Sequence, residues 1–248
     1  MKLVITLALL VATAFAAQSQ TPDNPLYEIR TYHCNEGKRP NLITRFQNHT
    51  TRIFEKHGME NIGYWLSTEN ENDLIYILAF PNKAARDAAW KSFIADPEWK
   101  AVAAASEVNG KILTGIDSEF LTLNSELTDK IKTNSELESP VFELRTYYCF
   151  PDKFPNIVAR FRDHTQAIFE THGMVNIAYF QTVKEGGSQP ELKYIIAHKN
   201  MEAAKASWSA FSNDPVWKKV YADSHIDGKI VEKVVSVYMK ALPFSDIK

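Results

Sequence analysis

Two short clusters of carboxylate, guanidinium and phenol groups are the residues whose types and spacing could do chemistry here. The first is Glu28, Arg30 and Tyr32, and the second is Glu143, Arg145 and Tyr147. Alternation along a strand puts each trio on one face, where the arginine could clamp a small organic anion. The glutamate could act as a base if burial raised its pKa. The alternative is purely structural, because a glutamate and an arginine two residues apart form a ready ion pair.

Histidines supply a second set of candidates. His49 and His164 fall at helical spacing with apolar neighbours, which predicts that they face a sheet. A histidine there could titrate near neutral pH or bind haem iron, or it could be a satisfied core residue. His198 replaces a phenylalanine, Phe80, of an earlier matching segment, which favours the second half of the chain as a ligand site, although exposure at a strand end also explains it.

Aromatic residues on the second predicted strand of each half complete the candidate ligand-binding set, and they could line the interior of a barrel. They are Tyr64, Trp65 and Tyr179. No cysteine and histidine spacing typical of zinc sites is present, so no dedicated metal site is expected. Cys34 and Cys149 are expected to be small core residues, and whether they pair is left open.

Composition narrows the class of partner. The chain has 248 residues, 45% hydrophobic residues and a formal net charge of −2. Such a balance provides no electrostatic reason to bind nucleic acid or an anionic membrane. We therefore expect a small-molecule partner rather than nucleic acid, and no insertion into a membrane.

The first 17 residues have the pattern of a signal peptide. Lys2 is followed by a short apolar run, and Ala14 and Ala16 stand where a signal peptidase reads small residues. The run is too short to span a bilayer. We expect cleavage near Ala16 or Ala17 and export to the periplasm or the medium.

An internal repeat is the strongest signal in the sequence. Residues 27–66 match residues 142–181 at 21 of 40 positions, and residues 74–112 match residues 192–230 at 19 of 39. Such similarity indicates one domain duplicated. We call residues 26–123 repeat 1 and residues 140–242 repeat 2, joined by a polar linker over residues 124–139.

Each repeat shows the order β-α-β-β-α-β. In repeat 1, strands are predicted over residues 27–34, 62–68, 74–80 and 111–123, with helices over 40–57, from Asn82, and from Asp96. This order predicts an α+β fold, a ferredoxin-like sheet with its helices on one face. Two such sheets packed face to face would form an intramolecular α+β barrel. We expect Ile29 to pack under the helices, so the face with Glu28, Arg30 and Tyr32, and its counterpart in repeat 2, would point into the space between the two sheets. The alternative is that each repeat pairs with another chain, so the oligomeric state stays open.

Several motifs resemble those of the NIPSNAP family. They are the run YEIRTY at residues 27–32, the helix end EKHG at 55–58 and the segment AAWKSFIADPEW at 88–99, with counterparts in repeat 2. The resemblance implies the dimeric α+β barrel architecture. That superfamily includes cofactor-free oxygenases, isomerases and haem-binding proteins, so the resemblance does not select an activity. A signal peptide and a duplication depart from the mitochondrial setting of animal NIPSNAP proteins.

These observations predict a small organic ligand in the barrel interior, with cofactor-free oxygenation or isomerisation as the accompanying chemistry. The alternatives are a non-catalytic protein that binds haem or another hydrophobic ligand, and a structural or interaction module. Whether the protein is an enzyme, and which cofactor it uses if any, are not decided by the sequence.

Overall fold

The computed structural model describes residues 25–184, 186 and 188–248. The predicted signal peptide, residues 1–17, lies outside the described residues. Each repeat has four strands and three helical segments, the first of which contains a π-helical turn. The elements of repeat 1 are β1 (Leu26–Cys34), α1 (Arg39–Arg45), η1 (Phe46–Thr50), α2 (Thr51–Lys56), β2 (Glu60–Ser67), β3 (Asp73–Phe80), α3 (Lys83–Ala95), α4 (Pro97–Ser106) and β4 (Leu113–Leu123). Those of repeat 2 are β5 (Val141–Cys149), α5 (Phe154–Arg160), η2 (Phe161–Thr165), α6 (Gln166–Thr171), β6 (Val175–Thr182), β7 (Leu192–His198), α7 (Met201–Asn213), α8 (Pro215–Asp223) and β8 (Val231–Ala241).

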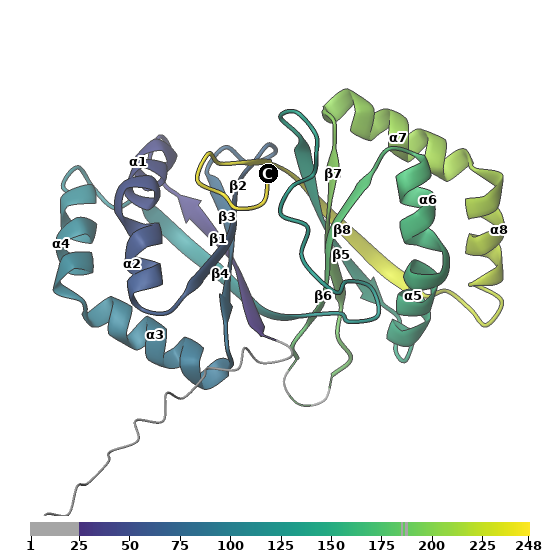
Figure 1. Ribbon diagram of the computed structural model, residues 1–248, viewed down its shortest axis with the longest axis horizontal. Coiled ribbons are helices and arrows are strands. Elements are labelled where there is room, and N and C mark those ends of the chain that lie inside the picture. Colours follow the sequence, from purple (N-terminus) through teal and green to yellow (C-terminus); the bar gives the residue numbers. More distant parts are fainter. Residues whose placement is uncertain (1–24, 185, 187) are drawn as a thin grey trace, which may run out of the picture.

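The strands form one closed, antiparallel, eight-stranded barrel in the order β1-β3-β2-β8-β5-β7-β6-β4. Each repeat contributes a four-stranded sheet, and short pairings of β2 with β8 and of β4 with β6 join the two sheets. The helices cover the outer faces, so the molecule has the layers helix, sheet, sheet, helix (Figure 1). The predicted intramolecular α+β barrel is therefore confirmed.

Apolar side chains fill the space between the two sheets. Its buried residues come from both repeats and include Tyr27, Ile29, Trp65, Phe142 and Phe180. A methyl group at Gly63 would overlap the Trp65 ring, so the glycine makes room for the indole. The corresponding positions in repeat 2 hold Ala178 and Phe180, a smaller ring beside a larger neighbour. The two halves thus fill the interior with matched volumes, as close packing requires.

The faces of the first strand are the reverse of the prediction. Ile29 points into the barrel interior, whereas Tyr32 belongs to the core between the sheet and the helices of repeat 1. Glu28 and Arg30 share the helix-facing side with Tyr32 because successive side chains on a strand alternate. The same holds in repeat 2, where Leu144 is inside the barrel and Tyr147 is under the helices.

The first helix of each repeat, α1–η1–α2 or α5–η2–α6, contains one π-helical turn. The backbone N–H of Thr51 donates to Phe46 O and that of Gln166 donates to Phe161 O, a spacing of five residues. The Thr50 hydroxyl also donates to the Arg45 carbonyl, five residues earlier, at 3.2 Å. One extra residue in a turn rotates the rest of the helix relative to a regular α-helix. Thr50 therefore occupies the buried stripe.

The second helices begin where the sequence predicts. The Asn82 and Asn200 side chains accept from Ala85 N and Ala203 N, which caps α3 and α7. The segment between the repeats has no helix or strand over residues 124–140, yet it packs closely against repeat 2. For example, Lys132 N donates to Ile177 O at 3.0 Å. This segment therefore helps to hold one repeat against the other.

Candidate functional site

Glu28 is fully buried under the helices of repeat 1 and accepts five hydrogen bonds. Arg86 of α3 is bidentate, with Nε 2.8 Å from Oε2 and Nη2 2.5 Å from Oε1. Trp90 Nε1 donates to Oε2 at 2.9 Å. Arg30 Nη1 and Ser118 Oγ donate to Oε1 at 2.5 and 2.6 Å. Every lone pair that a ligand could use is already occupied by the protein.

Glu143 occupies the equivalent place in repeat 2, and it too is fully buried. Arg145 Nη1 and Ser236 Oγ donate to its Oε1, each at 2.6 Å. Trp208 Nε1 and His198 Nε2 contact its Oε2 at 2.7 and 2.9 Å.

The two clusters differ in where their second basic partner comes from. In repeat 1 the partner is Arg86 on α3, and the matching position in repeat 2 is Ala204. In repeat 2 the partner is His198 at the end of β7, and the matching position in repeat 1 is Phe80. His198 is wholly buried, so exposure at a strand end does not account for it. Arg86 and Phe80 of repeat 1 thus correspond to Ala204 and His198 of repeat 2.

These contacts identify the buried glutamates as structural anions, which corrects the predicted role as bases. Burial acts to raise the pKa of Glu28, but hydrogen bonds from Arg86 and Ser118 and the charge of Arg30 lower it to about 2. Burial acts in the same way on Glu143, and the hydrogen bond from His198 and the charge of Arg145 lower its pKa to about 2. A carboxylate with so low a pKa is a weak base. The clusters tie β1 to α3 and β5 to α7.

The predicted aromatic candidates are divided among three cores. Trp65 lies inside the barrel, as predicted. Tyr64 and Tyr179 lie in the cores between sheet and helices, which corrects the prediction that they line the barrel. Tyr64 stacks on Tyr76 with ring centroids 5.5 Å apart, and the Tyr179 ring packs on Tyr194 in the same way. These rings are packing elements and do not form one site.

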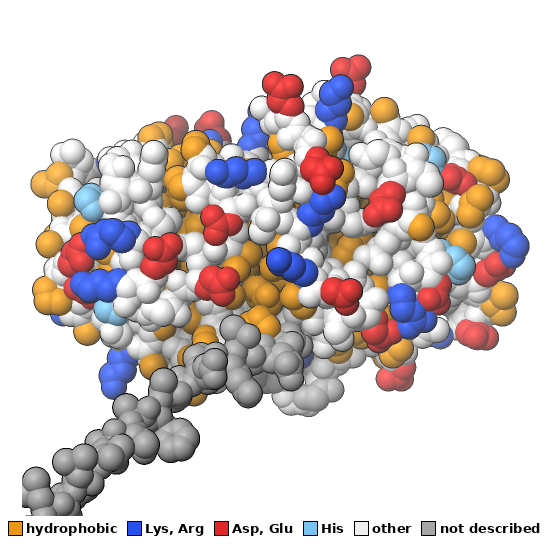
Figure 2. All heavy atoms as spheres, in the orientation of Figure 1, with side chains coloured by type: hydrophobic (Ala, Val, Ile, Leu, Met, Phe, Trp, Pro, Cys, Tyr) orange, Lys and Arg blue, Asp and Glu red, His pale blue; other side chains and the backbone are white. Residues whose placement is uncertain are grey.

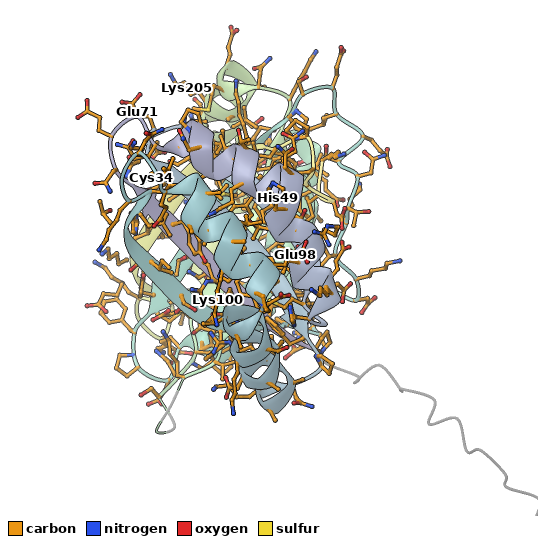
Figure 3. The ribbon with its side chains drawn as sticks, turned by 90° about the vertical axis from the view of Figure 1, so that its left-hand side faces the viewer. Cys34, His49, Glu71, Glu98, Lys100 and Lys205 are labelled. Atoms are coloured by element: carbon orange, nitrogen blue, oxygen red, sulfur yellow. The ribbon has the colours of Figure 1, made fainter. Side chains whose placement is uncertain are left out.

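His49 and His164 are exposed, which corrects the prediction that they face the sheet. The π-helical turn places Thr50 or Thr165 in the buried stripe instead and moves each histidine to the surface. Figure 3 looks onto the end of the molecule formed by repeat 1 and shows His49 on the first helix.

This rotation places His49 at a pocket between the first helix and α4. The repeat-1 pocket has a volume of about 670 Å³. Its lining combines small apolar side chains with a few polar groups. The residues are Pro40, Asn41, Thr44, Arg45, His49, Ala101, Val102, Ala105, Ser106, Val108 and Asn109. A mostly apolar pocket with a few convergent polar groups is the usual form of a small-molecule site.

Arg45 is the buried cation of this pocket, with 5% of its surface exposed. Its Nη1 donates to Ser106 Oγ at 3.2 Å and lies 3.8 Å from Glu107 Oε1. Its charge also lies over the Trp99 ring, 5.2 Å from the centroid. The buried Nε has no hydrogen-bond partner among the described residues, so the guanidinium that lines this pocket is not fully satisfied by the protein.

Repeat 2 has a matching but smaller pocket between its first helix and α8. The repeat-2 pocket has a volume of about 430 Å³. Arg160 takes the place of Arg45, and Ser224 takes the place of Ser106. His164 lines this pocket as His49 lines the other.

A third pocket of about 560 Å³ lies where repeat 1, the connecting segment and Asp246 meet. Tyr27 and Ile62, which contact the interior cluster, form part of its wall, together with charged residues such as Lys130 and Asp246. It thus borders the apolar cluster of the barrel interior, where the ligand site was predicted. Its wall has no deeply buried cation comparable to Arg45.

The cysteines and the charged surface add no further site. Cys34 and Cys149 are buried and free, and burial raises the pKa of each thiol to about 11. No group of acidic, histidine or cysteine residues suited to a metal ion occurs among the residues described. On the face drawn in Figure 2, basic and acidic side chains are interspersed. None of the helices that the structure describes is long and apolar enough to cross a membrane.

The sequence contains a signal for the pockets that reasoning from residue types misses. Arg45 and Arg160 belong to the repeated motif R-F-x-x-H-T at residues 45–50 and 160–165. Residue type and helical spacing single out the histidine of this motif but not the arginine, because helical spacing says nothing about a buried arginine. Only the π-helical turn, which comes directly after the arginine, places both side chains at one pocket.

Comparison with known proteins agrees with this architecture. The NIPSNAP family matches residues 27–126 and 142–246 of the chain, one segment for each repeat. The chain therefore belongs to the NIPSNAP family, and it is a tandem member of it. Among curated proteins no relative matches the chain.

Solved structures of similar fold include three that span nearly the whole chain. A monooxygenase-like protein from Lactobacillus acidophilus has a TM-score of 0.55 at 19% identity, over 90% of this chain and 94% of its own. A second, from Fusobacterium nucleatum, has a TM-score of 0.55 at 12% identity, over 88% and 92%. An anthrone oxidase-like protein also has a TM-score of 0.55 at 12% identity, over 90% and 94%. At these identities the likeness concerns the fold alone.

Proposed function

We propose that this tandem NIPSNAP protein binds a small, largely apolar organic molecule in the repeat-1 pocket. The observation that carries the proposal is the buried Arg45 guanidinium with its unpaired Nε, which lines a pocket whose other walls are mostly small and apolar. A ligand with an apolar body and one acceptor atom, such as a carbonyl or phenolic oxygen, matches this lining. The proposed site differs from the barrel interior that the sequence favoured, and it is supported by the apolar cluster of side chains that occupies that interior.

Glu107 limits the class of ligand that suits this pocket, because it balances the charge of Arg45. Its carboxylate lies 3.8 Å from the Arg45 guanidinium and offsets the buried positive charge. The pocket therefore offers a hydrogen-bond donor with little net charge, which favours a neutral polar group on the ligand over a full anion.

The experiment uses a matched pair of pocket-filling variants. Val102 lines the repeat-1 pocket, and Val220 at the corresponding position lines the repeat-2 pocket. The probe is 2-naphthol, a neutral aromatic phenol, followed by its own fluorescence. Val102→Trp is expected to weaken binding at least tenfold, about 1.4 kcal/mol, whereas Val220→Trp leaves it unchanged. Equal loss or no loss in both variants would refute the proposal, and Ala105→Leu repeats the test with a smaller change.

Catalysis is a second candidate, and His49 is the observation that favours it. Its imidazole lines the same pocket as the Arg45 guanidinium, and imidazole is the side chain that most often serves as a general base. Cofactor-free isomerisation or oxygenation of an enolic substrate, in keeping with the monooxygenase-like proteins of similar fold, would use such a base. His49→Asn should abolish turnover of an enolic substrate while leaving the affinity for 2-naphthol within twofold of that of the unmodified protein. Equal turnover by the variant and the unmodified protein would exclude this role for His49.

Haem binding is the non-catalytic alternative. His49 or His164 would be the axial ligand, since both are exposed at pockets. Titration with haemin should then produce a sharp absorption band that His49→Ala or His164→Ala removes. A titration without such a band would exclude haem.

We also propose that the chain is exported. The support is the sequence of residues 1–17 alone, a basic start followed by an apolar run and small residues at the cleavage point. Native mass spectrometry of the processed protein would then show whether it is a monomer or a larger assembly and whether it retains a small molecule after purification.

A further inference from the structure

The repeat-2 pocket differs from the repeat-1 pocket in charge. Arg160 is as buried as Arg45, with 6% of its surface exposed. The position that holds Glu107 in repeat 1 holds His225 in repeat 2. In the part of the chain that the structure describes, no carboxylate lies within ion-pair distance of Arg160. The second pocket therefore contains a buried guanidinium without a counter-charge.

The neighbours of Arg160 satisfy it only in part. Its Nη1 donates to Ser224 Oγ at 3.3 Å, and its charge lies 5.2 Å from the centroid of the Trp217 ring. The buried Nε has no hydrogen-bond partner among the described residues. An aromatic ring and a hydroxyl offset a buried cation less completely than a carboxylate does. Among the described residues, Arg160 therefore has no carboxylate that balances its charge.

The substituting histidine does not fill this role. His225 Nδ1 contacts the Tyr221 carbonyl oxygen at 2.6 Å, which requires that nitrogen to donate. Its ring packs on the Tyr221 ring, with centroids 4.1 Å apart. The imidazole, in the turn after α8, is thus held against Tyr221 of that helix and supplies no negative charge to Arg160.

Two aspartates at the rim already have cationic partners of their own. Asp163 pairs with Arg162 at 2.7 Å, and Asp223 pairs with Lys219 at 2.5 Å. These pairs are largely exposed, so water screens them. They leave Arg160 as the cation that an incoming anion meets inside the pocket.

We infer that the repeat-2 pocket is a second, separate ligand site, specific for a small organic carboxylate. A carboxylate matches the paired N–H donors of a guanidinium and would supply the missing counter-charge. The walls favour a carboxylate on an apolar body rather than an inorganic anion, because Val216, Val220 and the fully buried Ile230 line the same space. The two repeats thus provide similarly placed pockets with different charge preferences, a neutral polar group in repeat 1 and a carboxylate in repeat 2.

The test compares an acid with its neutral isostere on the full mature chain. The probes are 4-fluorobenzoate and 4-fluorobenzamide, followed by fluorine NMR. The unmodified protein should bind the acid at least tenfold more tightly than the amide. His225→Glu copies the carboxylate of repeat 1 without removing Arg160, so it should remove that preference. Glu107→His makes the reciprocal change and should create a second site for the acid.

Pocket filling separates this inference from the proposed function. Val220→Trp should remove 4-fluorobenzoate binding and leave 2-naphthol binding intact, whereas Val102→Trp should do the reverse. Equal affinity for acid and amide, or a preference for the acid that survives in His225→Glu, would overturn the inference. So would the absence of 4-fluorobenzoate binding at millimolar concentration, or displacement of the acid by equimolar inorganic phosphate.

Discussion

The two buried glutamates, Glu28 and Glu143, have different basic partners. Whether these partners are interchangeable can be tested by giving repeat 1 the residues of repeat 2, with Arg86→Ala and Phe80→His. Arg86→Ala removes two charge-assisted hydrogen bonds from Glu28. The carboxylate keeps Arg30 and Ser118 on Oε1 and Trp90 on Oε2. Loss of the bidentate partner from a buried anion should cost about 3 kcal/mol of unfolding free energy.

Phe80→His should have opposite consequences in two backgrounds. In the unmodified chain it removes a buried phenyl ring and crowds Arg86, which should cost about 2 kcal/mol. In the Arg86→Ala background the imidazole can donate to Glu28 Oε2, as His198 does to Glu143 at 2.9 Å. The second substitution should then recover part of the lost stability. We expect a coupling energy of about 2 kcal/mol in favour of the double variant.

Urea unfolding of the four proteins, followed by tryptophan fluorescence and circular dichroism, measures this coupling. Coincident transitions by the two methods would justify a single unfolding free energy for the chain. The reverse exchange, His198→Phe with Ala204→Arg, provides the matched control in repeat 2. If the two substitutions are additive within about 0.5 kcal/mol in both repeats, the idea that histidine replaces the arginine is wrong.

The fold and the sequence support three further predictions. The pKa of Glu28 and of Glu143 is about 2 in the folded chain, whereas the ordinary value is 4.5. The stability that these two carboxylates contribute is therefore present above pH 4.5 and is lost as the pH falls toward 2. Each loss should reach about 3 kcal/mol, and Glu143→Gln should flatten the dependence of urea midpoints on pH. Gly63→Ala should cost about 2 kcal/mol through overlap with the Trp65 ring, and Trp65→Phe in the same chain should recover most of that loss in thermal unfolding, since repeat 2 carries this pair. Amino-terminal sequencing of protein exported from cells should begin at residue 17 or 18, and an intact start at Met1 would exclude cleavage there.

The duplicated architecture was predictable because it rests on local and periodic signals. Proline in the first turn, Asn82 and Asn200 as helix caps, and apolar residues at helical or alternating spacing act within a few residues of one another. The repeat itself then implied two sheets with bare faces, and burying those faces against each other requires no knowledge of distant contacts.

The assignment of faces was not predictable in the same way. Strand alternation shows which residues share a face, but not which face meets the helices. Glu28 lies on the helix side because Arg86 and Trp90, about sixty residues later, provide its hydrogen-bond partners there. A buried carboxylate is stable only where such donors converge, and their convergence is a property of the packed fold.

The sequence by itself therefore determined the duplication, the element order and the barrel that results from them. Tertiary structure decided where the chemistry could be. A π-helical turn of one extra residue moved His49 to the surface beside a buried Arg45, and helical spacing calculated for a regular helix cannot reveal such a turn. Whether a buried arginine has a counter-charge depends on the residue that lies beside it at the end of α4 or α8, Glu107 in one repeat and His225 in the other. That pairing joins residues about sixty positions apart, so only packing of the helices could bring it about.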